Sequence, residues 1–173
     1  MHNLVPKRSS ELVPHFPWQA LIGTPVVAAT LLLTAPAQAQ AAPNPPLFQN
    51  VTLSPYSSQN PVTIRGISGG SVPATKVAGR TETATGPCAG FTDEKPDHTL
   101  VLTSFFKNLS IEVESPEDTT IAISGPGGTW CNDDHRGKNP GLSGQWLAGS
   151  YGIWIGSYEK NKYIPYAIRI QAK

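Results

Sequence analysis

The chain has 173 residues, which is enough for one ordinary domain and too few for two. Only 14% of its residues are charged, whereas about a quarter is typical of globular domains. The net charge of +1, with no long run of one sign, argues against nucleic-acid binding, which needs a basic surface. The 16 glycines and 17 prolines favour short strands joined by turns over helical bundles and coiled coils.

The N-terminus has the pattern of a Sec-type signal peptide. Lys7 and Arg8 precede an apolar, uncharged run over residues 20–33. Small residues then fit two cleavage frames, one after Ala39 and one after Ala41. A membrane-spanning helix needs about 20 apolar residues, so this shorter run favours cleavage over a permanent anchor.

These boundaries divide the chain into three parts. We predict a signal peptide over residues 1–39, a proline-rich extended leader over residues 40–49 and a single domain over residues 50–173. Cleavage of the signal peptide predicts a secreted or periplasmic protein without a remaining membrane segment.

Apolar and polar residues alternate with a period of two along the predicted domain, which indicates β-strands. Leu109, Ile111 and Val113 share one face of their segment, and Ile153 and Ile155 share one face of another. The segments recur about every ten residues with turns between them, as in all-β sandwiches and barrels. The predicted strands are residues 51–53, 62–64, 98–106, 109–115, 119–124, 151–158 and 164–170.

Residues 66–90 differ, because they are rich in Gly, Thr and Ala and contain few large apolar side chains. We predict a long irregular crossing with one weak strand near residues 75–78. Cys88 lies at its end, and Cys131 is the second of the chain's 2 cysteines. In an exported chain such a pair predicts one disulfide, and no second pair is spaced to complete a zinc site. Trp130, beside Cys131, is predicted to pack on the disulfide.

A set of short motifs resembles the small exported β-sandwich domains related to the bacterial pre-peptidase C-terminal domain, and cyanobacterial secreted proteins of unknown function in particular. The resemblance covers about residues 66–170. It implies an antiparallel, jelly-roll-like β-sandwich and a non-catalytic module, and some related collagen-binding domains bind calcium. The motifs are GPCAGF (86–91), PDH (96–98), SPEDTT (115–120), GPGGTWCNDD (125–134), NP (139–140), GQW (144–146) and YGIWIGS (151–157).

Asn132, Asp133 and Asp134 are the candidate metal ligands, because three consecutive oxygen-bearing side chains follow a glycine-rich turn. Ca²⁺ takes six to eight oxygen ligands in flexible geometry, and Asp118 before a neighbouring strand is a further candidate. The alternative is turn chemistry, because Asn and Asp side chains accept backbone N–H bonds in tight loops. Calcium is thus the one candidate cofactor, and the sequence requires none.

Trp154 and Tyr158 lie on one face of their predicted strand, with Gly152 and Gly156 flanking the indole. Exposed aromatic rings on a sandwich face stack on sugars, so these two are candidates for ligand stacking. The alternative is that they pack in the core or at the edge of the sandwich, as most tryptophans of small β-domains do.

Catalysis has little support in the sequence. Ser68 lies in a Gly-x-Ser-Gly-Gly segment, but no histidine precedes it in the predicted domain, as a trypsin-like order requires. His98 follows Asp97 at a strand start, where a hydrogen-bonded cap is the simpler interpretation. A hydrolase is therefore the least favoured function.

The sequence as a whole predicts an exported, non-enzymatic binding or structural module of the cell envelope or medium, for which stabilisation by calcium is one hypothesis. The alternative is a carbohydrate-binding module that uses Trp154 and Tyr158. The predicted partner is an extracellular or periplasmic protein or a glycan.

Overall fold

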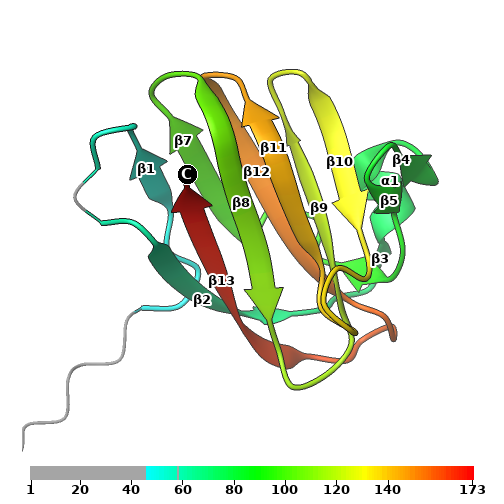
Figure 1. The fold of residues 1–173 in the computed structure, drawn as a ribbon. Helices are drawn as coiled ribbons and strands as arrows, with labels where there is room; N and C mark the ends of the chain where they lie inside the picture. The colour runs from blue at the N-terminus through cyan, green and yellow to red at the C-terminus, as the bar shows by residue number, and fades with distance from the viewer. Residues whose placement is uncertain (1–45, 58) are drawn as a thin grey trace, which may run out of the picture. The chain divides into compact units, whose positions relative to one another are not determined.

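The computed structural model describes residues 46–57 and 59–173, so the predicted signal peptide and most of the predicted leader lie outside the described residues. Figure 1 shows the strands and the short helix α1 (Ala74–Ala78). The strands are β1 (Val51–Leu53), β2 (Val62–Ser68), β3 (Val72–Pro73), β4 (Glu82–Thr83), β5 (Gly86–Pro87), β6 (Phe91–Thr92), β7 (His98–Leu102), β8 (Phe106–Glu114), β9 (Thr119–Gly125), β10 (Gly128–Asn132), β11 (Gly141–Trp146), β12 (Gly149–Ser157) and β13 (Ile164–Ala172).

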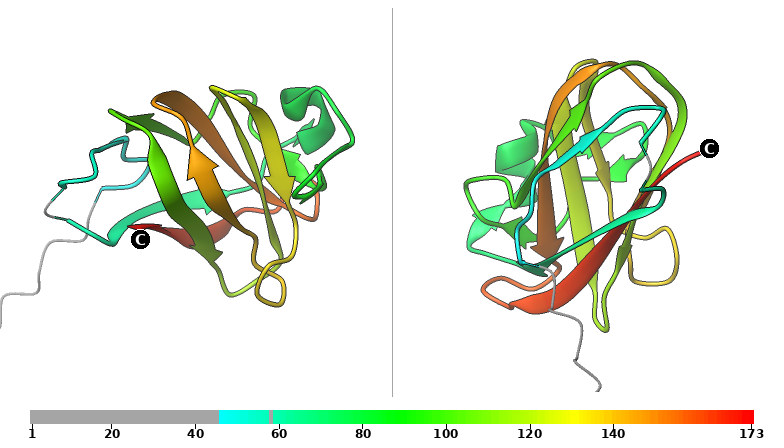
Figure 2. Two further views of the ribbon diagram at one scale, coloured as in Figure 1. Left: turned by 45° about the horizontal axis from the view of Figure 1, so that its top comes forward. Right: turned by 90° about the vertical axis from the view of Figure 1, so that its left-hand side faces the viewer.

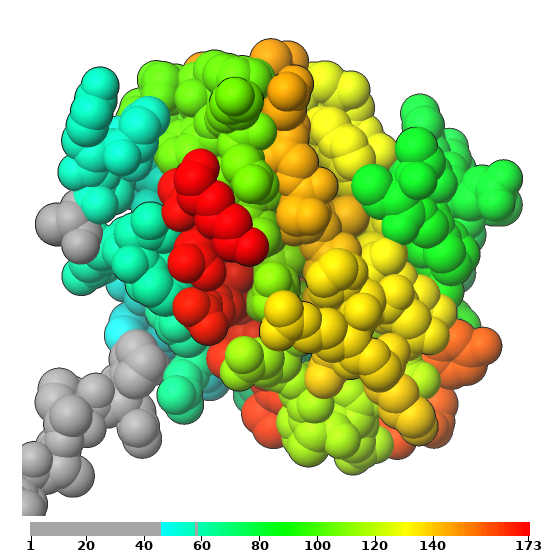
Figure 3. Space-filling view, viewed as in Figure 1, coloured from blue at the N-terminus to red at the C-terminus, as the bar shows by residue number. Residues whose placement is uncertain are grey.

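In the described part of the chain, a seven-stranded sheet and a four-stranded sheet pack face to face as a sandwich (Figure 2). The larger sheet runs β10-β9-β12-β7-β1, with β6 paired to the end of β12 and β3 paired to β6. The smaller sheet has the order β11-β8-β13-β2, and Figure 3 shows β13 in red between β2 and β8. Strand β1 pairs in parallel with β7, whereas the other ladders are antiparallel.

The core forms where the alternating apolar residues of both sheets meet. Leu109, Ile111 and Val113 of β8 are buried, as are Ile153 and Ile155 of β12. They join one cluster with the apolar residues of the facing sheet, because side chains on alternate positions point to the same face. The predictions of an all-β sandwich and of these inward faces are confirmed.

Two segments differ from the prediction. Residues 98–106 form two strands instead of one, because β7 ends at Leu102 and the chain turns before β8 begins at Phe106. Residues 75–78 belong to helix α1 and not to a weak strand, and Gly79 ends the helix with φ of 68°. Glycine adopts this left-handed conformation without a steric penalty, so it stops a short helix where a strand was predicted.

The predicted disulfide Cys88–Cys131 is confirmed, with a Cα–Cα distance of 5.0 Å. Around it a second apolar cluster covers the outer face of β9, where Ala78 of α1 packs with Ala122. The tryptophan that packs against this cluster is Trp154 and not Trp130. The prediction for Trp130 was wrong, because its indole packs against the main core between the sheets.

The first described residues belong to the sandwich although the prediction placed them in a leader. Leu47 bridges to Arg65 of β2, and the Phe48 N–H donates to the Arg65 carbonyl at 2.9 Å. The chain then crosses to the other sheet, where Val51–Leu53 pairs with β7. This segment therefore lies along the free edges of both sheets.

Candidate functional site

Three loops meet at one end of the sandwich, which we call the loop end: residues 115–118, 133–140 and 158–163. Asn139 joins the first two, since its Nδ2 donates to the Ser115 carbonyl at 2.9 Å and its Oδ1 accepts from the Thr119 hydroxyl at 3.0 Å. Lys162 joins the third loop to the first through an ion pair with Glu117. Sequence analysis missed Asn139 as a positioning residue, although its Asn-Pro pair belongs to the motif set.

The loop end carries an acidic loop cluster, which consists of Asp118, Asp133 and Asp134. Strands β9 and β10 pair antiparallel, so the residue before β9 and the residues after β10 reach the same end of the sheet. Burial, together with the negative charges of Asp134 and Asp118, raises the pKa of Asp133. Three of the four residues that the sequence proposed as calcium ligands therefore lie at the same end of the sheet.

One carboxylate oxygen in each of two cluster residues is buried without a hydrogen-bond partner: Oδ1 of Asp118 and Oδ1 of Asp133. A buried carboxylate oxygen without a partner destabilises the fold unless a cation or water satisfies it. Among the described residues, no group of three or more His, Cys, Asp and Glu side chains is arranged around a common point. Two carboxylates would thus have to be complemented by main-chain oxygens and water, which Ca²⁺ accepts.

Asn132, the fourth predicted ligand, has a structural role. Its Oδ1 accepts the Gly141 N–H and its Nδ2 donates to the Thr85 carbonyl, both at 2.9 Å. These bonds match the alternative of turn chemistry, because they connect β10 to the β4–β5 hairpin and to the start of β11. We therefore leave Asn132 out of the cation site.

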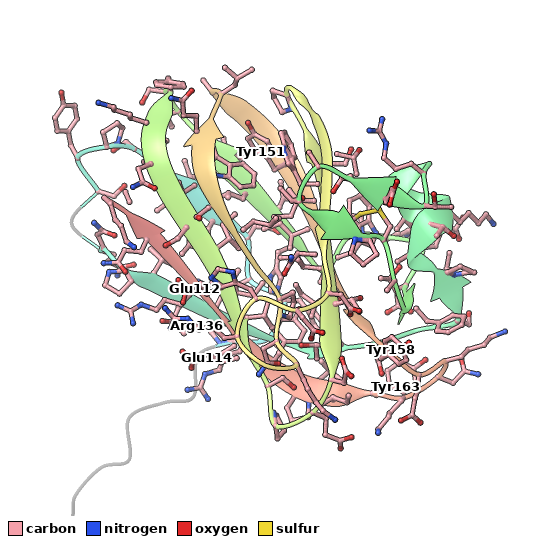
Figure 4. All side chains as sticks on the ribbon, turned by 45° about the vertical axis from the view of Figure 1, so that its right-hand side comes forward. Glu112, Glu114, Arg136, Tyr151, Tyr158 and Tyr163 are labelled. Carbon is pink, nitrogen blue, oxygen red and sulfur yellow. A yellow bond between two sulfur atoms is a disulfide. The ribbon has the colours of Figure 1, made fainter. Side chains whose placement is uncertain are left out.

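The two predicted stacking residues differ in their exposure. Trp154 is half-buried on the disulfide cluster, and its indole N–H donates to the Glu94 carbonyl at 3.4 Å. Tyr158 lies beyond the end of β12 and is 55% exposed, and Tyr163 at the start of β13 is 59% exposed (Figure 4). Sequence analysis missed Tyr163, whose only signal is an aromatic side chain beside a turn.

On the outer face of the smaller sheet, Glu112 and Glu114 of β8 lie beside the loop that carries Arg136 (Figure 4). The Arg136 guanidinium is 3.3 Å from the Glu112 carboxylate. His135 lies over Gly141, where the missing side chain leaves room for the imidazole ring. An exposed ion pair of this kind contributes little to stability, about 0 to 1 kcal/mol.

His98 is sequestered in the core, with 1% of its surface exposed. Its Nδ1 is 2.8 Å from the Gln49 carbonyl, and its Nε2 is 2.8 Å from the Tyr166 hydroxyl. A carbonyl oxygen only accepts, so the neutral ring carries its proton on Nδ1 and accepts the Tyr166 O–H at Nε2. Burial lowers the pKa of His98, and the ring serves as a structural link between three segments.

Asp97 precedes His98 in the chain and lies beside this network. Its Oδ2 accepts the N–H of Ile155, a residue of β12 in the larger sheet, at 2.7 Å. Burial raises the pKa of Asp97 from 3.8 to about 7, against the opposing effect of the Ile155 hydrogen bond and with a further increase from Asp93. Burial and the charge of Asp97 also raise the pKa of Tyr166.

Gly66 makes room for this network, because a Cβ at this position would overlap the Tyr166 hydroxyl. We expect Gly66→Ala to lower the free energy of unfolding by about 1 to 3 kcal/mol, since overpacking would displace the hydroxyl that His98 needs. Urea denaturation measures this change. Arg65→Ala, an exposed neighbour in β2, is the control and should leave the midpoint within experimental error; equal midpoints for both variants would contradict the prediction.

No family model matches the chain. An uncharacterized protein of Synechococcus elongatus is 32% identical over 65 residues, which are 38% of this chain and 48% of that protein. The chain thus spans about half the length of the curated relative that it matches.

Two solved structures are similar to the chain. One is the pre-peptidase C-terminal domain of collagenase from Bacillus anthracis, with 13% identity, a TM-score of 0.41, and coverage of 75% of this chain and 100% of that one. The other is PliG of Aeromonas hydrophila, a periplasmic lysozyme inhibitor, with 13% identity, a TM-score of 0.39, and coverage of 72% and 98%. The motifs suggested both likenesses, to a pre-peptidase C-terminal domain and to a cyanobacterial uncharacterized protein.

Proposed function

We propose that this chain is an exported, non-enzymatic binding module of the cell envelope or medium, built on a jelly-roll-like sandwich and stabilised by Ca²⁺ at the acidic loop cluster. The observation that carries this proposal is the pair of buried, unpartnered carboxylate oxygens on Asp118 and Asp133. These oxygens lie on two different loops, so a cation between them would join both loops in the folded state only.

The disulfide and the signal-peptide pattern support export. Cys88 and Cys131 pair, and disulfides persist mainly in oxidising compartments such as the periplasm and the medium. Within the residues that the structure describes, none of the helices has the length and apolarity to cross a membrane.

The buried positions of the catalytic candidates support a binding role. His98 is 1% exposed and Ser68 is 0% exposed, so neither side chain can meet a substrate without opening of the fold. A nucleophile and its base must lie within hydrogen-bond reach of each other and of a substrate. The accessible chemistry lies instead in carboxylates and tyrosines of the loop end.

Tyr158 and Tyr163 provide the partner surface of the proposed module. Both rings are more than half exposed, and the Tyr158 N–H lies 3.5 Å from the Asp118 carbonyl, so the surface adjoins the acidic loop cluster. Tyrosine is enriched at interfaces because it combines apolar area with one hydrogen-bonding hydroxyl. The partner is an extracellular or periplasmic protein, and the alternative is a glycan that stacks on Tyr158.

Calcium should raise the thermal midpoint of the chain with its disulfide intact. A ligand that binds only the folded state adds about 2.7 kcal/mol at 100 times its dissociation constant, which corresponds to several degrees for a domain of this size. The measurement is a thermal melt in EDTA and in millimolar Ca²⁺.

Asp133→Asn separates this effect from damage to the fold. The variant should lose the calcium shift while its midpoint in EDTA stays equal or rises, because the repulsion from Asp134 and Asp118 is removed. Glu94→Gln, at an exposed site in the loop between β6 and β7, should keep the full shift. A wild-type midpoint that is the same in EDTA and in Ca²⁺ would exclude the calcium proposal.

A further inference from the structure

A groove of about 590 Å³ lies between the free edges of the two sheets, away from the acidic loop cluster. Strand β1 is the edge of the larger sheet and β2 is the edge of the smaller one, and both line the groove. In Figure 1 both strands lie at the left-hand side of the view, with β1 above β2. The volume falls within the range of about 300 to 1,000 Å³ that is typical of small-molecule sites.

The chemistry of the lining is uncharged and rich in hydrogen-bonding groups. None of the lining residues has an ionisable side chain, and amides and hydroxyls alternate with apolar side chains such as Val51, Leu53 and Val62. An anion would need Lys or Arg here, and a cation would need carboxylates. The amide and hydroxyl residues are Gln49, Asn50, Thr52, Ser57, Gln59 and Thr63.

Several of these groups keep their hydrogen-bonding capacity for a ligand. Among the hydrogen bonds of the described residues, none uses the side chains of Gln49, Thr52, Gln59 or Thr63. Both walls of the groove thus carry side chains with unused hydrogen-bonding capacity, Gln49 and Thr52 on one and Gln59 and Thr63 on the other. Such groups bind the hydroxyls of a sugar, which both donate and accept.

The buried network holds one wall of the groove in place. His98 fixes the Gln49 main chain at 2.8 Å, and the Thr99 N–H donates to Asn50 Oδ1 at 2.7 Å. The second bond leaves the Asn50 Nδ2 as an oriented donor. A wall that is ordered before binding lowers the entropy cost of binding.

We propose that this groove binds a neutral saccharide. Its amides and hydroxyls bind the sugar hydroxyls, and Val51 and Val62 contact the apolar C–H face of the ring. Tyr56, which is 95% exposed in the turn beside the lining residue Ser57, supplies an aromatic ring for stacking on a further sugar unit. The site is independent of the calcium proposal, because none of the acidic loop cluster lines it.

The test is an NMR titration of the ¹⁵N-labelled chain in EDTA with four neutral tetrasaccharides: maltotetraose, cellotetraose, chitotetraose and isomaltotetraose. We expect at least one to shift the amides of Gln49, Asn50, Thr52, Gln59 and Thr63 in a saturable manner. Gln59→Ala and Thr63→Ala should each weaken binding about three- to tenfold, the effect of one lost hydrogen bond. Gln145→Ala, an exposed glutamine on β11 at the other edge of the smaller sheet, should leave the affinity unchanged.

Three outcomes would overturn the proposal. The first is the absence of any shift at these amides with all four sugars at millimolar concentration. The second is a sugar that shifts only the amides of the loop over residues 158–163, which would place glycan binding at the loop end. The third is an extended Thr-Val-Thr-Val peptide that shifts the groove amides while the sugars do not, which would assign the groove to strand addition by a protein.

Discussion

Replacing Cys88 and Cys131 together by alanine will lower the free energy of unfolding by about 4 kcal/mol. The disulfide closes a loop of 43 residues, and its loss restores to the unfolded chain the conformational freedom that the cross-link removes. Both positions are buried, at 3% and 0% exposure, and alanine keeps the apolar character of the second cluster. The loss should therefore reflect the cross-link more than the packing.

Urea denaturation of the double variant and of the wild type measures this effect. Addition of a reductant to the wild type is the matched control, and it should reproduce most of the decrease. Helix α1 and the β4–β5 hairpin lie next to this cross-link, so their amides should also exchange faster in the variant. A decrease below about 1 kcal/mol would show that packing of Ala78, Ala122 and Trp154 holds this region without the disulfide.

The stability of the domain should fall as the pH rises, because of Asp97. Its pKa is raised from 3.8 to about 7 in the folded chain, so between these values the folded state binds more protons than the unfolded state. Stability from this group is therefore complete below pH 3.8 and is lost as the pH rises through about 7. The total loss is about 4 kcal/mol, since each tenfold difference in proton affinity between the folded and unfolded states corresponds to about 1.4 kcal/mol.

Asp97→Asn isolates this contribution. Asparagine keeps an oxygen that accepts the Ile155 N–H and cannot ionise, so the variant should be about as stable as the wild type at pH 4 and more stable at pH 8. The measurement is the difference in unfolding free energy between the two proteins across this range. Glu94→Gln, an exposed neighbour, should show no such divergence, and parallel curves for Asp97→Asn and the wild type would refute the prediction.

His98 has the opposite effect on the pH dependence of wild-type stability. Its pKa is lowered in the folded state, so below pH 6.5 the unfolded chain binds a proton that the buried ring does not bind. Stability from this group therefore falls as the pH decreases. The two contributions oppose each other in mildly acidic solution. Comparing variant and wild type at each pH cancels the His98 contribution, which both proteins share.

The strands were the most predictable part of the fold. Inward faces such as Leu109, Ile111 and Val113 follow from alternation, which depends only on near neighbours in the chain. The segment over residues 98–106 was predicted as a single strand because Phe105 and Phe106 resume the apolar pattern directly after Thr103 and Ser104. Helix α1 was missed because its five residues make little more than one turn, which is too short for a helical period to be detected.

The candidate site was predictable in its acidic residues and less so in its partners. Asp118 and Asp133 were identified because carboxylates beside strand ends are few in a charge-poor chain. Tyr163 and Asn139 were missed, because their roles depend on which loops meet at one end of the sandwich. Trp154 and Tyr158 were predicted together because they share the outward face of one strand. Strand alternation does not show which outward side chains other segments cover, and the disulfide cluster packs against Trp154 alone of the two.

The sequence by itself determined the β class, the inward faces of most strands and the disulfide, because each follows from local periodicity or from a single pair of cysteines. Only the tertiary structure decided what lies against what. His98 meets Gln49 and Tyr166, which are 49 and 68 residues away along the chain. Trp154 is covered by the disulfide cluster, and two sheet edges form an uncharged groove. Such contacts depend on how the sheets pack, and no local pattern encodes that packing.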